Sequence, residues 1–136
     1  MVRIDVDYQG GLRCRAVHAP SGATFVSDAP LDNHGKGESF SPTDTLATSL
    51  VSCMLTVMGI RAKREGWAME GSSGSVEKHM TSEPPRRVAR LVVTVQMRAP
   101  GLDDAAKSAL IETAENCPVR LSLGENVTVT TNYSWA

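Results

Sequence analysis

The sequence predicts an α+β fold, because its strands and helices occur in separate groups in the order β-β-β-α-β-β-α-α-β. Two features carry this prediction. Residues 2–8 alternate apolar and polar side chains, which is typical of a half-buried strand. A long apolar helix is predicted from about Pro42 to Glu65. The 136 residues suit one domain, 1–136, that is large enough to bury a hydrophobic core.

Three short strands are predicted before that helix. Gly10-Gly11 is a hairpin turn signal after the first strand. Residues 12–18 form the second strand, Pro20-Ser21-Gly22 forms another turn, and residues 23–27 form the third strand. We therefore expect an antiparallel meander. The polar loop that follows, residues 28–40, is long for a compact domain, and such loops are often functional.

The long helix has recognisable start and stop signals. Ser41 is suited to the N-cap, Pro42 to the first helical position and Asp44 to the third. At the other end, cationic residues precede Gly66, as expected at the negative end of the helix dipole. Apolar side chains surround much of the helix between these ends, which predicts a buried helix.

A second group of strands and two further helices follow. The clearest pattern lies between residues 87 and 98, where every second residue is apolar and one face of a strand is predicted to be buried. The residues of that face are Leu91, Val93, Val95 and Met97. The other predictions are a long strand or hairpin arm over 67–80 interrupted at Gly71–Gly74, a turn at Pro84-Pro85, a helix capped by Asp103 and running to about Glu115, a short helix from Pro118 to Leu123, and a last strand from Val127 to Trp135.

Charge and composition exclude several classes of protein. The 14 Lys and Arg residues are balanced by 15 Asp and Glu, which argues against a nucleic-acid partner. No secretory signal is visible at the N-terminus. The apolar stretch Ala47–Ile60 is too short and too polar to span a membrane. We expect a cytoplasmic protein with no membrane partner, in which a cysteine pair is catalytic or metal-binding rather than structural. The three histidines are scattered and no closely spaced ligand pair is present, so no metal or other cofactor is expected.

The three cysteines have different interpretations. Cys53 lies in the middle of the apolar helix, where a core thiol is the usual interpretation and a reactive thiol needs a cation from another element. Asn116 or Cys117 caps the short helix, and free N–H groups at that position favour a thiolate. By this argument Cys117 is the more acidic thiol, and the alternative is an ordinary buried cap. Cys14 follows strand alternation and is interpreted as a packing residue.

Three motifs together resemble the OsmC/Ohr superfamily of small thiol peroxidases that reduce organic hydroperoxides. The first is the segment Asp32–Asp44, DNHGKGESFSPTD, in which Ser41 begins a Ser-Pro-x-Asp helix start twelve residues before Cys53. The second is the small-residue-rich helix around that cysteine, SLVSCM over residues 49–54. The third is Cys117-Pro118-Val119, with Cys117 placed 64 residues after Cys53. The predicted order of strands and helices is similar to that of the family over nearly the whole chain.

The resemblance implies a fold and a reaction. The fold would consist of antiparallel sheets packed on a long buried central helix, in an intertwined homodimer with active sites at the subunit interface. Cys53 would attack the peroxide O–O bond and become a sulfenic acid, and Cys117 would then form a disulfide with it. An external dithiol reductant would restore both thiols. The substrates would be organic hydroperoxides, with hydrogen peroxide as a second candidate, and no cofactor is required.

The family also uses an arginine–carboxylate pair to hold the attacking thiolate. The candidate cations in this sequence are Arg13, which follows the Gly-Gly turn, and Lys36 in the long loop. The candidate carboxylates are Glu38 and Asp44. Each has an ordinary interpretation as well, namely a surface residue, a solvated loop residue or, for Asp44, a helix cap. With an incomplete pair, the alternative function is a non-catalytic OsmC-like module that binds an apolar small molecule or senses a redox signal.

Overall fold

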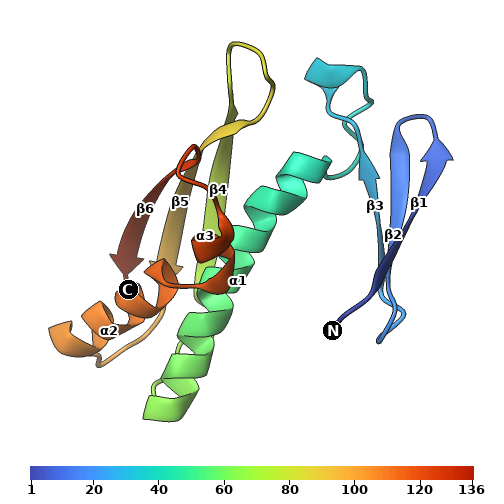
Figure 1. Cartoon of the computed structure of the whole chain (residues 1–136). Coiled ribbons are helices and arrows are strands. Elements are labelled where there is room, and N and C mark those ends of the chain that lie inside the picture. Colours follow the sequence, from blue (N-terminus) through green and yellow to red (C-terminus); the bar gives the residue numbers. More distant parts are fainter. The chain divides into compact units, whose positions relative to one another are not determined.

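The computed structural model of the chain describes residues 1–136 and divides into two compact units, Met1–Leu46 and Ala47–Ala136 (Figure 1). Each unit contains one three-stranded sheet. The predicted α+β class is confirmed, and so is the predicted order of strands and helices. The first unit is called the N-terminal unit below and the second the C-terminal unit.

The N-terminal unit is an antiparallel meander, as predicted. Its strands are β1 (Ile4–Gly10), β2 (Arg13–His18) and β3 (Thr24–Asp28), paired in that order. Gly10 and Gly11 both have positive φ values, of 79° and 62°, which the tight turn between β1 and β2 requires. A short 3-10 helix, η1 (Leu31–Asn33), interrupts the loop that was expected to be irregular.

The apolar face of this sheet is exposed, contrary to the prediction that the first strand is half-buried. The register places Val6 opposite Ala16 and Ala16 opposite Phe25, so these side chains share one face. Val6 is 61% exposed and Tyr8, on the same face, is 67% exposed. Alternation in the sequence identifies the apolar side of a strand correctly, but it does not reveal whether the same chain covers that side.

The long helix α1 (Pro42–Glu65) has the bounds that the sequence predicts. At its start, the Asp44 N–H donates to Ser41 Oγ at 3.1 Å and the Ser41 N–H donates to Asp44 Oδ2 at 2.8 Å. This reciprocal capping satisfies two backbone donors that the helix leaves free. At its end, Gly66 adopts a φ of 74° and the Trp67 N–H donates to Ala62 O at 2.8 Å.

The helix α1 was predicted to be buried over most of its circumference, and the structure buries one face fully. Leu50, Met54 and Met58 are fully buried, whereas Ile60 is 56% exposed. The stretch Ala47–Ile60 was expected to be too short and too polar to span a membrane, but the whole of α1 is long and apolar enough to do so by length and composition alone, with a mean hydropathy of 1.4 over 18 residues. Its buried face belongs to the hydrophobic core of the C-terminal unit, and the core helix of a globular protein can have the same length and hydropathy.

The sheet of the C-terminal unit is mixed rather than antiparallel. Its order is β4-β5-β6, with β4 (Ser73–Met80) antiparallel to β5 (Val88–Met97) and β6 (Thr128–Trp135) parallel to β5. A parallel neighbour requires a crossover connection, which α2 (Asp104–Glu115) and α3 (Pro118–Ser122) provide. The prediction that the sheets are antiparallel is therefore wrong for this sheet. The predicted strand over 67–80 also begins late, at Ser73.

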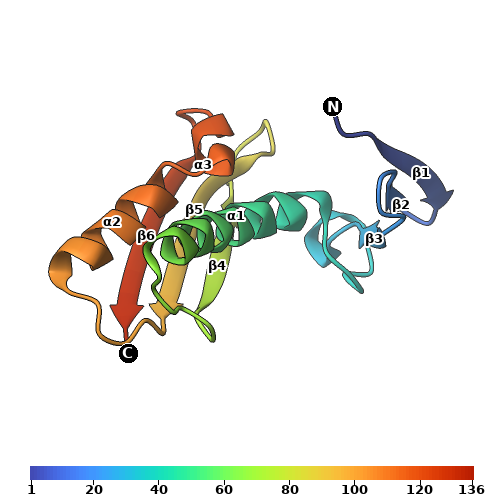
Figure 2. The same cartoon turned by 90° about the horizontal axis from the view of Figure 1, so that it is seen from below.

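Both α1 and α2 pack on one face of this sheet (Figure 2). The alternate residues of β5 that were predicted to be buried are at most 1% exposed. They form a continuous core with the buried face of α1 and with Leu110 and Ala114 of α2. Burial of this apolar surface is the main stabilising contribution to the unit.

Gly74 allows α1 to approach β4 closely. A Cβ atom at this position would lie 2.6 Å from Val51 Cγ1 and 3.5 Å from Leu55 Cδ1, both on α1. The first distance is far below van der Waals contact, and a β-branched valine has little freedom to turn away. The glycine in β4 therefore fixes how near the helix lies to the sheet.

Replacing Gly74 by alanine should lower the free energy of unfolding by about 1–3 kcal/mol, because the added methyl group overpacks the contact between α1 and β4. Urea denaturation of wild type and Gly74→Ala measures the change. Ser75→Ala, at the next and exposed position of β4, is the matched control and should stay within about 0.5 kcal/mol of wild type. In a Val51→Ala background the Gly74→Ala cost should shrink, and an unchanged cost would contradict the proposed contact.

Candidate active site

Two of the three cysteines come together in the C-terminal unit. Cys53 lies in the middle of α1, is partly buried, and packs against the hydrophobic core. Cys117 is fully buried in the same core. Burial raises the pKa of Cys117, and the Cys53 thiol, which lies within interaction range of it, adds to that increase. Two reduced thiols within interaction range are suited to reversible disulfide formation.

The turn between α2 and α3 places Cys117. Its N–H donates to Ala114 O at 3.1 Å, which ties it to the last turn of α2. Its Sγ accepts from the Arg120 N–H at 3.4 Å, so Cys117 is the N-cap of α3, with Pro118 at the first helical position. The sequence-based prediction of a cap at this point is confirmed, with Cys117 rather than Asn116 in the capping position.

The expectation that capping makes Cys117 an acidic thiol is wrong. Burial raises the pKa of Cys117, and the N–H groups of Arg120 and Val119 lower it by less than burial raises it. The position in sequence identified the helix start correctly, but it did not reveal that the cap is buried in the core. Cys117 is therefore protonated over the neutral range.

A second polar cluster lies in the N-terminal unit. Arg13, the first residue of β2, is paired in register with Asp28, the last residue of β3. Arg13 Nη2 lies 3.4 Å from Asp28 Oδ2 and 2.5 Å from Glu38 Oε2. The Glu38 N–H also donates to Asp28 Oδ2, at 3.0 Å. The structure thus brings together two of the predicted site residues, Arg13 and Glu38, around a buried Asp28.

Asp28 is a member of this cluster that sequence reasoning missed. The only feature that could have identified Asp28 is its position opposite Arg13 in the meander, and this position is known only once the strand register is known. The Glu38 N–H, and after it the Arg13 guanidinium, lower the pKa of Asp28 although burial acts in the opposite direction. A lowered pKa means that the charged form stabilises the fold above its unfolded value of about 3.9, and that this contribution is lost as the pH falls through the folded pKa.

A tight loop holds Glu38 beside Arg13. A Cβ atom at Gly35 would lie 1.7 Å from Ala29 O, so only glycine fits there. The Gly35 N–H donates to Pro30 O at 3.0 Å and the Gly37 N–H donates to Ala29 O at 3.2 Å. The polar loop is therefore an ordered connection that folds back on its own start.

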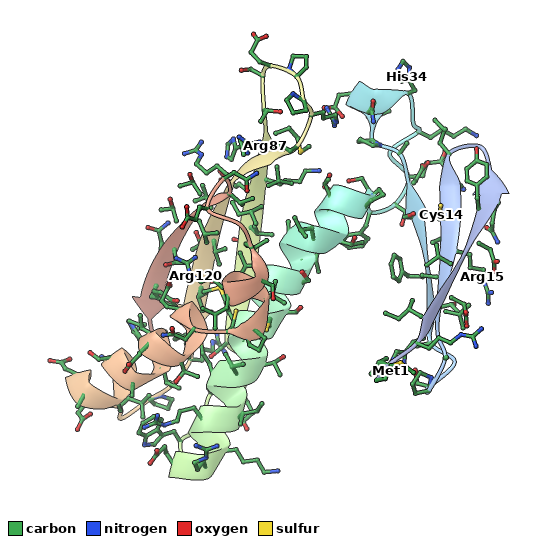
Figure 3. The ribbon with its side chains drawn as sticks, in the orientation of Figure 1. Met1, Cys14, Arg15, His34, Arg87 and Arg120 are labelled. Carbon is green, nitrogen blue, oxygen red and sulfur yellow. The ribbon has the colours of Figure 1, made fainter.

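The other predicted site residues are placed differently. Lys36 is exposed in the loop and does not take part in the cluster of Arg13. Asp44 uses one carboxylate oxygen to cap α1. Cys14 lies on β2 (Figure 3) opposite Tyr8, on the apolar face of its sheet rather than on the face of Arg13, as strand alternation predicts.

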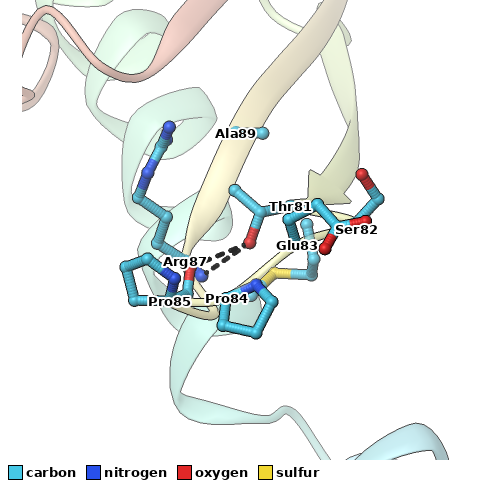
Figure 4. A pocket seen from close by; sticks show the side chains of 8 residues that line it. Thr81, Ser82, Glu83, Pro84, Pro85, Arg87 and Ala89 are labelled. Carbon is cyan, nitrogen blue, oxygen red and sulfur yellow. Dashed lines mark hydrogen bonds between the residues drawn. The ribbon is translucent and has the colours of Figure 1, made fainter.

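A further hollow, of about 460 Å³, lies at the turn between β4 and β5 (Figure 4). Thr81 closes this turn, because its N–H donates to Arg87 O at 2.9 Å and its Oγ1 accepts from the Arg87 N–H at 3.2 Å. Pro84 and Pro85 line the hollow, and neither member of the thiol pair does. This hollow is therefore separate from the thiol chemistry.

Comparison with known proteins agrees with this α+β fold. Residues 35–132 match the model of the family described as OsmC-like protein, so the chain belongs to the OsmC family. A solved structure from Psychrobacter arcticus 273-4, a candidate osmotic stress induced and detoxification response protein, is 40% identical, with a TM-score of 0.91 over 98% of this chain and 96% of that one. A comparison with curated proteins found no match.

More distant structures share the fold. The OsmC-like protein from Mycoplasma pneumoniae is 13% identical and has a TM-score of 0.83 over 100% of this chain and 97% of that chain. An organic hydroperoxide resistance protein OsmC from Legionella pneumophila is 18% identical, with a TM-score of 0.73 over 98% of this chain and 96% of that chain. At these identities the likeness establishes a common architecture.

Alkylation of Cys117 in the folded, reduced chain should have a pH midpoint above that of the unfolded chain, because only the thiolate reacts and burial raises its pKa. Mass spectrometry after timed iodoacetamide quenches at pH 7–10, with and without urea, measures both midpoints. The contribution of the buried Cys117 thiol to the free energy of unfolding should likewise be fully present below about pH 8.5. It should decrease as the pH rises through the folded pKa of Cys117. Coinciding midpoints in folded and unfolded protein would contradict this reasoning.

Proposed function

We propose that the chain is a thiol-dependent peroxidase that reduces organic hydroperoxides through Cys53 and Cys117. Membership of the OsmC family and solved structures described as organic hydroperoxide resistance proteins point to a peroxide-related role. The observation that carries the specific proposal is the placement of two thiols, 64 residues apart in sequence, within interaction range of each other.

The proposed reaction has three steps. The Cys53 thiolate attacks the distal peroxide oxygen, so that an S–O bond forms, the O–O bond breaks, and an alkoxide leaves and is protonated to an alcohol. Cys117 then attacks the Cys53 sulfenic acid, giving a Cys53–Cys117 disulfide and water. A dithiol reductant finally exchanges with this disulfide and restores both thiols. Cys53 is the attacking residue in this scheme because burial keeps Cys117 protonated.

The first step requires a cation near the Cys53 thiolate, since a thiol in an apolar environment is otherwise held protonated. We assign this role to Arg13, oriented by Glu38. The pair is preassembled in the N-terminal unit, with Glu38 held by its loop. Lys36 is the rival cation and is outside this cluster. Asp44 is assigned to helix capping, since its carboxylate accepts from the Ser41 N–H.

A homodimer is part of the proposal. The exposed apolar face of the β1-β2-β3 sheet includes a hollow of about 180 Å³ lined by Ile4, Ala16 and Phe25 among others. A contiguous apolar face of this kind is typical of an interaction surface, and a second copy of the chain would remove it from water. We further propose that residues 1–136 act as one functional domain, in the reducing cytoplasm where a dithiol reductant is available.

The purified, reduced chain should consume cumene hydroperoxide in the presence of dithiothreitol or dihydrolipoamide, and Cys53→Ser should abolish turnover. Cys117→Ser should retain the first reduction and accumulate Cys53 sulfenic acid. Stoichiometric peroxide followed by mass spectrometry should reveal one Cys53–Cys117 disulfide. Turnover no greater than that of Cys53→Ser, with slow and unselective oxidation of cysteines and methionines, would instead indicate the non-catalytic binding module.

Arg13→Gln should slow the first peroxide step by about a hundredfold, because it removes the charge that the proposal assigns to stabilising the reacting thiolate. Arg13→Lys keeps a charge and should recover part of the rate. Lys36→Gln is the matched control and should leave the rate unchanged. Stopped-flow measurement of single-turnover peroxide consumption compares the variants, and a rate loss in Lys36→Gln but not in Arg13→Gln would transfer the role to Lys36.

A further inference from the structure

Glu115, the last residue of α2, is the centre of a polar cluster that the proposed peroxide chemistry does not use. Its Oε1 accepts from Thr131 Oγ1 at 2.6 Å and from Tyr133 Oη at 2.7 Å, both on β6. Its Oε2 lies 3.0 Å from Arg120 Nη2 on α3. We call Glu115, Arg120, Thr131 and Tyr133 the Glu115 bracket. The bracket ties three elements of the C-terminal unit together through one carboxylate.

The bracket encloses the turn that holds Cys117. Glu115 lies two residues before Cys117 and Arg120 three residues after it, so their ion pair closes across the turn. The same Arg120 also donates its backbone N–H to Cys117 Sγ at 3.4 Å. The Arg120 side chain lies on the β6 side of α3 (Figure 3). The sulfur is thus fixed from both ends of its turn and anchored to the sheet.

The members of the bracket are partly buried, so their hydrogen bonds and ion pair stabilise the fold more than the same interactions between surface groups would. The side chains of Glu115 and Arg120 are each 26% exposed. Burial and the carboxylate of Glu115 both raise the pKa of Tyr133, so its hydroxyl remains a hydrogen-bond donor throughout the physiological range. A partly buried carboxylate with three partners holds its neighbours more firmly than an exposed ion pair does.

We propose that Glu115 is a positioning residue for disulfide formation: through Arg120 and β6 it holds Cys117 Sγ against Cys53 for the second step of the reaction. The inference rests on the proposed peroxidase function. In that step the Cys117 sulfur attacks the sulfur of the Cys53 sulfenic acid, an S–S bond forms, and the S–O bond breaks. The leaving hydroxide takes the proton of Cys117 and departs as water.

The geometry makes this step sensitive to placement. Cys117 is held as a neutral thiol by burial, so its reaction depends on the sulfur being aligned with its target rather than on a large thiolate fraction. A displacement of about 1 Å can reduce the rate of a positioned reaction about a hundredfold. Nothing in the bracket touches Cys53 in α1 through a hydrogen bond or an ion pair, so the first step should not depend on it.

The test separates the two steps in single-turnover experiments with Glu115→Ala and Glu115→Gln. Dimedone trapping of Cys53 sulfenic acid measures the first step, and quenched alkylation with mass spectrometry measures the Cys53–Cys117 disulfide. We expect the first step to stay within about twofold of wild type and disulfide formation to slow about tenfold or more in Glu115→Ala. Glu115→Gln retains an oxygen for Thr131 and Tyr133 and should lose less.

Glu112→Gln is the matched control, an exposed glutamate one turn earlier on α2, and should leave both steps unchanged. Tyr133→Phe removes a single donor and should give a smaller loss in the same step, which keeps the proposal testable should Glu115→Ala not fold. A disulfide rate equal to wild type in both Glu115 variants overturns the inference. An equal loss in both steps also overturns it, because that is the result of general destabilisation.

Oxidation by diamide distinguishes failure of this inference from failure of the proposed function. Diamide oxidises vicinal thiols to a disulfide without a peroxide, and its second step again needs Cys117 to reach Cys53. A wild-type chain that is inactive on peroxides but forms the Cys53–Cys117 disulfide faster than Glu115→Ala supports the positioning role and contradicts the peroxidase. Equal diamide rates in wild type and Glu115→Ala contradict the positioning role whatever the peroxide activity.

Discussion

The close packing of α1 on the mixed sheet is the constraint on which the thiol pair depends. Gly74 in β4 lets the helix approach until Val51 touches the strand, and the buried face of α1 then shares one core with α2. Because α2 and α3 pack on the same face of that sheet as α1, the middle of α1 and the start of α3 come together over this face (Figure 2). Neither cysteine is placed by residues close to the other in sequence. A shift of α1 away from β4 would therefore also move Cys53 relative to Cys117.

Burial and reactivity oppose each other in this core. The apolar packing that stabilises the C-terminal unit also removes water from Cys117 and raises its pKa, although the sulfur caps a helix. The N-terminal unit contains a polar cluster of its own, in which Arg13 pairs with Asp28 and Glu38. The C-terminal unit thus holds two cysteines at its apolar core, and the N-terminal unit holds the charged cluster.

Local signals in the sequence predicted most of the fold, and the long-range relations were the part that they missed. The caps at Ser41 and Asp103 and the buried face of β5 depend on neighbours a few residues away, and all three are confirmed. The parallel pairing of β6 was missed, because alternation of side chains does not encode strand direction. Asp28 and Glu115 were missed for a related reason: apart from Arg120, which is close to Glu115 in sequence, their partners lie 10–18 residues away. An acidic residue at the end of a strand or helix also resembles a solvated one.

The crossover from β5 to β6 has a topological consequence. Because it delivers Cys117 to α1, a bond between the two sulfurs would enclose the rest of α1, the β4–β5 hairpin and α2 in one covalent ring. Such a ring, closed between cysteines 64 positions apart, removes chain entropy from the unfolded state, which amounts to about 4 kcal/mol in the loop-closure model. The oxidised molecule would then be harder to unfold than the reduced one. Its resistance to heat and to proteases would stay higher until the disulfide is reduced.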